Sequence, residues 1–256
     1  MQNSQENFQT PEEQIGKSKL EVLKERNIVN FDMDLSPKEK ESVDALKIEV
    51  ELPEFNHYGP ISDDLIKNLK EHLYNLGDNL DGIIESVSRI IKRVTGGMIT
   101  DFNAESAWVA VRTSLPNNQW SIPRWHKDGR YFKLKDPKDK VYKLVMAIKG
   151  APTRFGIATD SEKFERLSEE GNKNYTKICE NKERRTELEQ EDLRIRRELA
   201  NIVQEMPTLE AEQATLYLVG DEDAIIHSEP DMKDPRLFVS VLVGSKEQID
   251  EWKQNG

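Results

Sequence analysis

The residues of this chain best suited to chemistry are two histidines, one aspartate and one arginine. His126 and Asp128 are separated by one lysine, and His227 follows His126 by 101 residues. Two neutral imidazoles and one carboxylate can bind one face of a divalent ion such as iron(II) and leave other positions open. Because residues i and i+2 of a strand point to the same face, His126 and Asp128 can both face inward from one strand end. We therefore predict that His126, Asp128 and His227 are catalytic metal ligands.

Other residues compete for these roles. Glu229 lies two residues after His227, so it is an alternative to Asp128 as the acidic ligand. A proline follows Glu229 directly and favours a turn, so we prefer Asp128. His57 and His72 are poorer candidates, because His72 falls within an apolar helical pattern. If there is no site, these histidines are surface residues of turns, where polar side chains are common.

The half of the chain that holds the candidate ligands has the texture of a β-structure. Short apolar runs alternate with turn residues, which is typical of a sandwich or barrel. Arg236 precedes the clearest of these runs and shares a strand face with Phe238 and Ser240. The predicted strands are 108–113, 141–148, 214–219, 224–227 and 237–243.

Helices and polar segments surround these strands. Residues 1–35 are rich in amides and charges, so we predict a flexible N-terminal tail with one short helix at 17–26, followed by a single domain over 36–256. An alternating strand is expected at 46–52, a helix from Ser62, and a second helix at 80–94 that ends at Gly96-Gly97. A charged insert at about 160–212 contains a predicted amphipathic helix at 183–206.

Composition limits the compartment and the partners. The net charge is −11 at a sequence pI near 5.1, which disfavours nucleic-acid binding. The single cysteine, the polar N-terminus and the lack of a membrane-length apolar run indicate a soluble, cytoplasmic protein without signal peptide or membrane partner. Residues 124–154 contain ten basic and three acidic side chains, a local balance of +7, so the unknown substrate is expected to be anionic.

The order His126-x-Asp128, a long gap, His227 and then Arg236 resembles the motif of the iron(II)/2-oxoglutarate-dependent dioxygenases. The resemblance covers about residues 100–245, and 150–153 also look like a turn of a little-characterised bacterial branch. It implies a mostly β fold with flanking helices (α+β), built on a double-stranded β-helix, or jelly roll. It also implies that His126, Asp128 and His227 hold iron(II), that Arg236 binds the distal carboxylate of 2-oxoglutarate, and that Tyr142 adds a hydrogen bond to this small-molecule cosubstrate.

The function implied by this resemblance is the hydroxylation of a substrate with release of succinate and carbon dioxide. Two alternatives remain at this stage. One is a cupin-type metalloenzyme that does not use 2-oxoglutarate, in which Arg236 would be exposed. The other is a non-catalytic jelly-roll module that binds a protein partner, or a second copy of itself, through the helix at 183–206.

Overall fold

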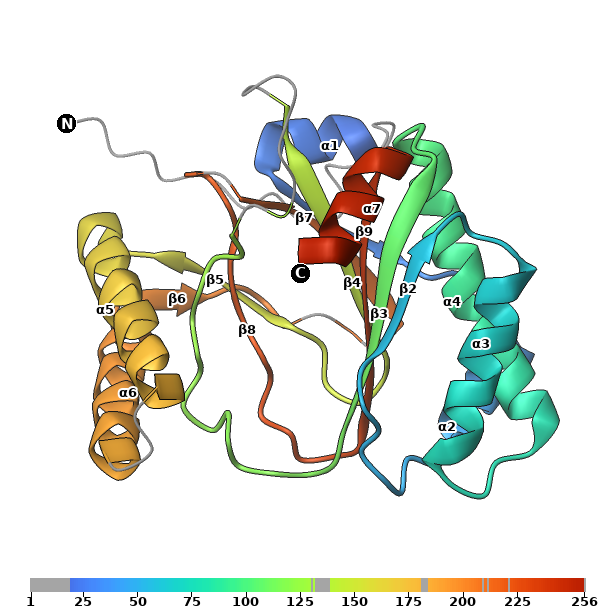
Figure 1. Cartoon of the computed structure of the whole chain (residues 1–256), viewed down its shortest axis with the longest axis horizontal. Helices are drawn as coiled ribbons and strands as arrows, with labels where there is room; N and C mark the ends of the chain where they lie inside the picture. Colours follow the sequence, from blue (N-terminus) through green and yellow to red (C-terminus); the bar gives the residue numbers. More distant parts are fainter. Residues whose placement is uncertain are drawn as a thin grey trace.

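Two antiparallel sheets face each other in the computed structural model, which describes residues 19–129, 131, 139–180, 184–208, 210, 212–220 and 222–255 (Figure 1). In these residues the larger sheet has the order β1 (Ile28–Asp32), β7 (Gln213–Val219), β4 (Val141–Lys149), β9 (Arg236–Gly244), β3 (Ser106–Ser114) and β2 (Phe55–Gly59). The smaller sheet has the order β6 (Val203–Glu205), β5 (Arg154–Ala158) and β8 (Ile226–Ser228).

The path of the chain between the sheets defines the fold. From β3 the chain passes to residue 126, which bridges to β8 in the smaller sheet, and returns through β4 to the larger sheet. It then visits β5 and β6 in the smaller sheet, β7 in the larger, β8 in the smaller and β9 in the larger. The adjacent order is therefore β3-β9-β4-β7 in one sheet and residue 126-β8-β5-β6 in the other. This is a double-stranded β-helix, as the resemblance to a known family implied.

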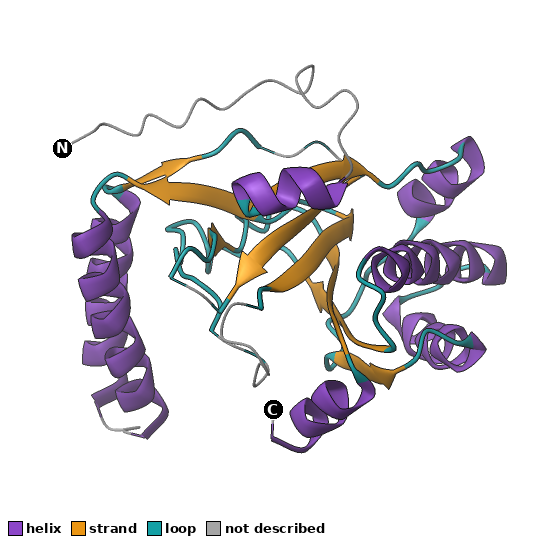
Figure 2. Ribbon diagram, turned by 90° about the horizontal axis from the view of Figure 1, so that it is seen from above, coloured by secondary structure: helices purple, strands orange, loops and turns teal. Residues whose placement is uncertain are grey.

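Helices cover the outer face of the larger sheet. Alternate apolar residues of β3, β4 and β9 point outward and pack against the helices, which leaves the other face of each strand for the interior. Figure 2 shows most of these helices gathered on one side of the strands. They are α1 (Lys19–Arg26), α2 (Pro37–Ala45), α3 (Asp63–Leu73), the short 3₁₀ helix η2 (Tyr74–Leu76) and α4 (Asp81–Asp101), while α7 (Lys246–Asn255) contacts β2, β3 and β9.

Two expectations about this layer were wrong. The helix expected at 80–94 continues through Gly96 and Gly97 to Asp101. A glycine inside a helix costs only about 1 kcal/mol, and burial of Met98 against the sheet favours continuation. The segment 46–52 is not a strand, although Leu46 and Ile48 are buried. Its backbone forms hydrogen bonds with η2 and with a side chain of β3 instead of with a neighbouring strand. Buried and exposed residues therefore alternate here although the segment belongs to no sheet.

The N-terminal segment from Lys19 onward is structured, contrary to the tail expected over 1–35. Helix α1 buries Val22 and Leu23, and β1 forms the edge of the larger sheet by pairing with β7. Helix α1 matches the short helix expected at 17–26, whereas β1 was not predicted. Strand β1 is short, and its pairing partner lies almost 190 residues away in β7. The part of the predicted tail before Lys19 lies outside the described residues.

The charged insert forms two helices rather than one. They are α5 (Ser161–Glu180) and α6 (Arg185–Ala200), which lie side by side at one end of the molecule (Figures 1 and 2). Helix α6 ends before the predicted limit, because the chain turns at Asn201 into β6. Phe164 of α5 and Leu199 of α6 pack with Ile226 of β8 in one buried cluster, so the helix pair covers the outer face of the smaller sheet.

None of the helices in the described part of the chain combines the length and the apolar character that a membrane crossing requires.

We predict that Leu23→Ala lowers the free energy of unfolding by about 2–5 kcal/mol, because it empties a fully buried position between α1 and the sheet. The neighbouring exposed residue provides the control, and Lys24→Ala should change stability by less than about 0.5 kcal/mol. Urea unfolding of both variants measures the difference. Equal stability of the two variants would show that α1 is not part of the folded core.

Candidate metal centre

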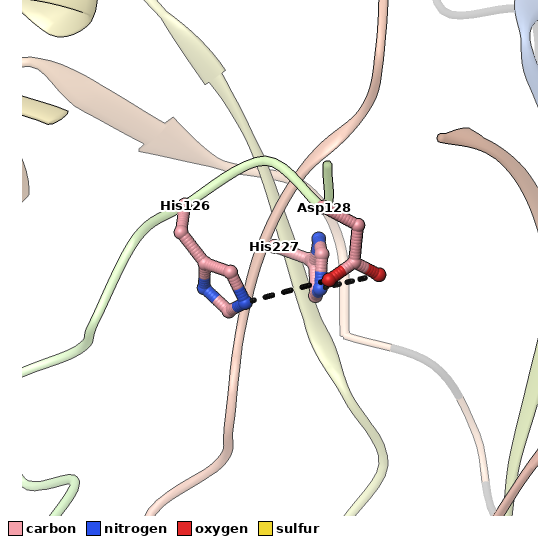
Figure 3. Close-up of side chains that lie close together, drawn as sticks. All are labelled: His126, Asp128 and His227. Carbon is pink, nitrogen blue, oxygen red and sulfur yellow. Dashed lines mark ion pairs between the residues drawn. The ribbon is translucent and has the colours of Figure 1, made fainter. Parts of the chain in front are cut away.

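The three predicted ligands lie together in the interior between the sheets (Figure 3). The backbones of His126 and His227 exchange two hydrogen bonds, of 3.0 and 2.9 Å, which pair the loop after β3 with β8. The two imidazole centroids are consequently 4.3 Å apart. Asp128 Oδ1 is 3.9 Å from His126 Nε2, and Asp128 Oδ2 is 3.5 Å from His227 Nε2. One ligand atom from each residue lies within 4.8 Å of the others, a separation that a single ion can bridge.

The insert holds the ligand loop in place from behind. Trp125 points away from His126 and is buried in the cluster formed by α5, α6 and the smaller sheet. Gly156 of β5 makes room for this packing, because a Cβ there would lie 3.3 Å from the Trp125 ring and 2.4 Å from Val203 Cγ1. Side chains of an extended segment point alternately to opposite faces. Because the Trp125 side chain points outward, those of His126 and Asp128 point inward.

Backbone carbonyls orient both imidazole rings. His126 Nδ1 is 2.8 Å from the carbonyl oxygen of Arg124, and His227 Nδ1 is 3.2 Å from that of Ile225. A carbonyl accepts only, so each Nδ1 carries the proton and each Nε2 presents a lone pair toward Asp128. This is the arrangement in which metal-ligating histidines are usually held.

Burial sets the protonation states that a metal requires. It lowers the pKa of His126, and it lowers the pKa of His227 to about 3, helped by the neighbouring His126. For Asp128 burial acts in the opposite direction, but His227 and Lys143 outweigh it and hold the pKa of the carboxyl well below its usual range. Near neutral pH the site therefore offers two neutral imidazoles and an ionised carboxylate.

Asp128 has two further neighbours that the sequence analysis did not single out. Lys143 Nζ of β4 donates to Asp128 Oδ2 at 2.8 Å, and the hydroxyl of Tyr217 of β7 donates to the same oxygen at 3.2 Å. The Lys143 ammonium also donates to the Tyr131 hydroxyl at 3.1 Å. Burial opposes the charge of Lys143, but Asp128 and Tyr131 raise its pKa above the ordinary value. The sequence signal that could have revealed Lys143 is a single lysine among the apolar residues of the predicted strand at 141–148.

Arg236 lies at the start of β9 and is buried, with 5% of its surface exposed. Its Nε donates to the carbonyl oxygen of Ala151 at 2.8 Å, and its Nη2 to Thr153 Oγ1 at 3.4 Å. The guanidinium lies 4.3 Å from the centre of the Phe238 ring. Among the described residues no carboxylate lies within ion-pair distance of it, although burial lowers its pKa only to about 10 and it remains charged. The interior thus holds a cation suited to an external anion.

The alternative acidic ligand, Glu229, is engaged elsewhere. Its carboxylate accepts from Arg124 Nη2 at 2.7 Å and from Arg124 Nε at 3.4 Å. Burial raises the pKa of Glu229, but Arg124 reverses this and keeps the pKa below the ordinary value. The geometry therefore groups Asp128, not Glu229, with the two histidines.

Tyr142 does not face the site, so its predicted contact with a cosubstrate was wrong. It packs against the core between the larger sheet and the helices, with its ring 5.7 Å from that of Phe102. Successive strand residues point to opposite faces, and Lys143 is the inward one of this pair. The remaining histidines also lie elsewhere: His57 Nε2 is 3.0 Å from the carbonyl oxygen of Pro60, and His72 packs near Phe55.

Known proteins offer distant likenesses only. No protein-family profile and no curated protein matches the sequence. Among solved structures, a dioxygenase for auxin oxidation from rice is 9% identical with a TM-score of 0.43, over 85% of this chain and 73% of that one. A Pseudomonas putida prolyl-4-hydroxylase is 9% identical with a TM-score of 0.38, over 88% of this chain and 90% of that one.

A viral collagen prolyl hydroxylase from Paramecium Bursaria Chlorella virus-1, solved as a 2-oxoglutarate complex, is 10% identical. Its TM-score is 0.36, over 87% of this chain and 98% of that one. These structures are of the kind that the sequence motif predicted. At such low identities and TM-scores they add no support for a function, which is inferred below from strand order and side-chain geometry.

The depressed pKa of both histidines predicts a flat pH dependence of metal binding. Two ordinary imidazoles with a pKa near 6.5 would weaken binding roughly a hundredfold between pH 7.5 and 5.5, because protons compete for both. Here the lowered pKa of each imidazole keeps its neutral form to lower pH, so the Kd for cobalt(II) should rise by much less than a hundredfold. Titration at the two pH values measures this, and a hundredfold loss would mean that the imidazoles titrate as if exposed.

Proposed function

We propose that this protein is an iron(II)- and 2-oxoglutarate-dependent oxygenase that hydroxylates a substrate and releases succinate and carbon dioxide. The observation that carries the proposal is the joint burial, inside one jelly roll, of two groups of residues. One is the cluster of His126, Asp128 and His227, and the other is Arg236, a cation without a carboxylate partner in the described chain.

The side chains fit both groups that such an oxygenase binds. His126, Asp128 and His227 would hold the iron. Their imidazoles are neutral and their carboxylate is ionised, which are the protonation states that iron(II) requires of its ligands. Iron(II) bound there supplies the redox chemistry through which 2-oxoglutarate is decarboxylated and the substrate hydroxylated. The planar guanidinium of Arg236 would receive the distal carboxylate of 2-oxoglutarate through paired hydrogen bonds.

The surroundings of Arg236 would strengthen this contact. Phe238 lies against the guanidinium and Phe155 belongs to the same interior cluster, so little water is available to weaken an ion pair. Ala151 and Thr153 hold the guanidinium through two of its nitrogens. A fixed guanidinium loses little rotational freedom on binding an anion, which favours affinity.

The cupin-type alternative, without 2-oxoglutarate, predicted an exposed Arg236. The buried position of this side chain favours the oxygenase over that alternative. A partner-binding role for the insert stays a prediction. Its motivation is that Tyr175 of α5 and Leu193 of α6 are exposed, at 63% and 37%.

The first test is anaerobic titration of the metal-free protein with iron(II) and 2-oxoglutarate, followed by the visible charge-transfer band of the chelate. Arg236→Ala should weaken 2-oxoglutarate binding roughly tenfold to a hundredfold, the usual worth of a charge-assisted contact. Arg154→Ala is the matched control, because Arg154 lies on β5 and pairs with Glu205. Iron binding without any band in the wild type would favour the cupin-type alternative, and absence of metal binding would favour the interaction module.

The second test is the formation of succinate in uncoupled turnover, which needs no knowledge of the substrate. Asp128→Asn should reduce the rate by at least about a hundredfold, because an amide is a poor substitute for an anionic ligand. Asparagine is preferred to alanine, because its carbonyl can still accept from Lys143 and avoids leaving a buried ammonium without a partner. Circular dichroism and thermal unfolding check the fold. Wild-type rates in this variant would contradict the assignment of Asp128.

A further inference from the structure

The two oxygens of the Asp128 carboxylate have different surroundings. Oδ2 accepts one hydrogen bond from Lys143 Nζ at 2.8 Å and one from the Tyr217 hydroxyl at 3.2 Å. A carboxylate oxygen has two lone pairs, so these donors occupy the acceptor capacity of Oδ2. Oδ2 also lies 3.5 Å from His227 Nε2, and Oδ1 lies 3.9 Å from His126 Nε2. The carboxylate is therefore set to offer one oxygen to a metal.

Two neighbouring strands fix these donors. Lys143 of β4 and Tyr217 of β7 are direct cross-strand partners, so their side chains leave the sheet side by side on its inner face. The Tyr217 side chain is fully buried, and that of Lys143 is 10% exposed. The second bond of the ammonium, to Tyr131, limits its freedom further. The donors are held by the sheet and not by a mobile surface.

We infer that Lys143, supported by Tyr217, is a positioning residue that restricts Asp128 to binding the metal through Oδ1 alone. The inference rests on the proposed function. Iron(II) held by His126, Asp128 and His227 would keep positions open for the cosubstrate and for oxygen. If Asp128 bound through both oxygens, it would take one of these positions. Lys143 thus preserves the position on which an oxygenase depends.

The charge of Lys143 makes this role distinct from simple structural support. A cation beside a metal ligand opposes the binding of another cation, so the arrangement lowers metal affinity in exchange for an open position. A residue that only stabilised the fold would not produce this opposition. Replacement of Lys143 by an uncharged side chain of similar length should therefore tighten metal binding and remove the open position together.

The test compares Lys143→Met with the wild type and with Lys149→Met. Lys149 is a matched control, because it lies on the same strand and its ammonium donates to the backbone carbonyls of Val43, Asp44 and Leu46, outside the site. Iron(II)-loaded protein is exposed anaerobically to nitric oxide, which reports an open position by its paramagnetic resonance signal. The signal is recorded with and without saturating 2-oxoglutarate, and the iron(II) Kd is measured separately.

Wild type and Lys149→Met should keep most of the nitric oxide signal when 2-oxoglutarate is present. Lys143→Met should bind iron(II) on the order of tenfold more tightly and lose most of the signal once 2-oxoglutarate is added. Lys143→Arg, which keeps a charged donor, should restore the wild-type pattern, and Tyr217→Phe should lie between. If Lys143→Met does not fold, the last two variants carry the test.

An unchanged signal and an unchanged Kd in folded Lys143→Met would overturn the inference while leaving the proposed function intact. Weaker iron binding in that variant would also overturn it, because the ammonium would then support the ligand and not restrict it. Failure of the wild type itself to bind iron(II) or 2-oxoglutarate would be a failure of the proposed function, which the wild-type titration detects first.

Discussion

The site depends on the pair of backbone hydrogen bonds between His126 and His227. These bonds attach the loop after β3 to β8, and without them the smaller sheet would lack its fourth segment. The same pairing places His126 and Asp128 beside His227, which follows His126 by 101 residues in the sequence. The geometry of the metal centre is thus a direct result of sheet closure.

A second constraint is electrostatic. Charges buried in the interior must be paired, because the cost of removing an ion from water is large. Asp128 is paired with Lys143, and Glu229 with Arg124. Among the described residues of this interior, Arg236 has no carboxylate partner, and its guanidinium donates hydrogen bonds to a carbonyl and a hydroxyl oxygen. An unpaired buried cation is costly for folding, which is the physical reason to expect that an anion completes it.

The outer layers make a polar interior possible. Most of the apolar burial lies between the larger sheet and helices α1 to α4, and a smaller cluster lies between the smaller sheet and α5 and α6. A third apolar cluster, which includes Phe155 and Phe238, lies between the sheets beside the site. The insert holds Trp125 and, through it, the ligand loop.

The sequence by itself was sufficient for features that depend on local pattern. The strands around 108–113, 141–148, 214–219, 224–227 and 237–243 followed from short apolar runs separated by turn residues. The grouping of His126, Asp128 and His227 followed from motif spacing, and the jelly roll from the resemblance to a known family. Only the tertiary structure could show that β1 joins the larger sheet, that Tyr142 faces the helices and that Lys143 and Tyr217 meet on one oxygen of Asp128. These depend on strand register, and a shift of one residue reverses every side chain. Register is decided by pairing between distant segments, so it is absent from any local stretch of sequence.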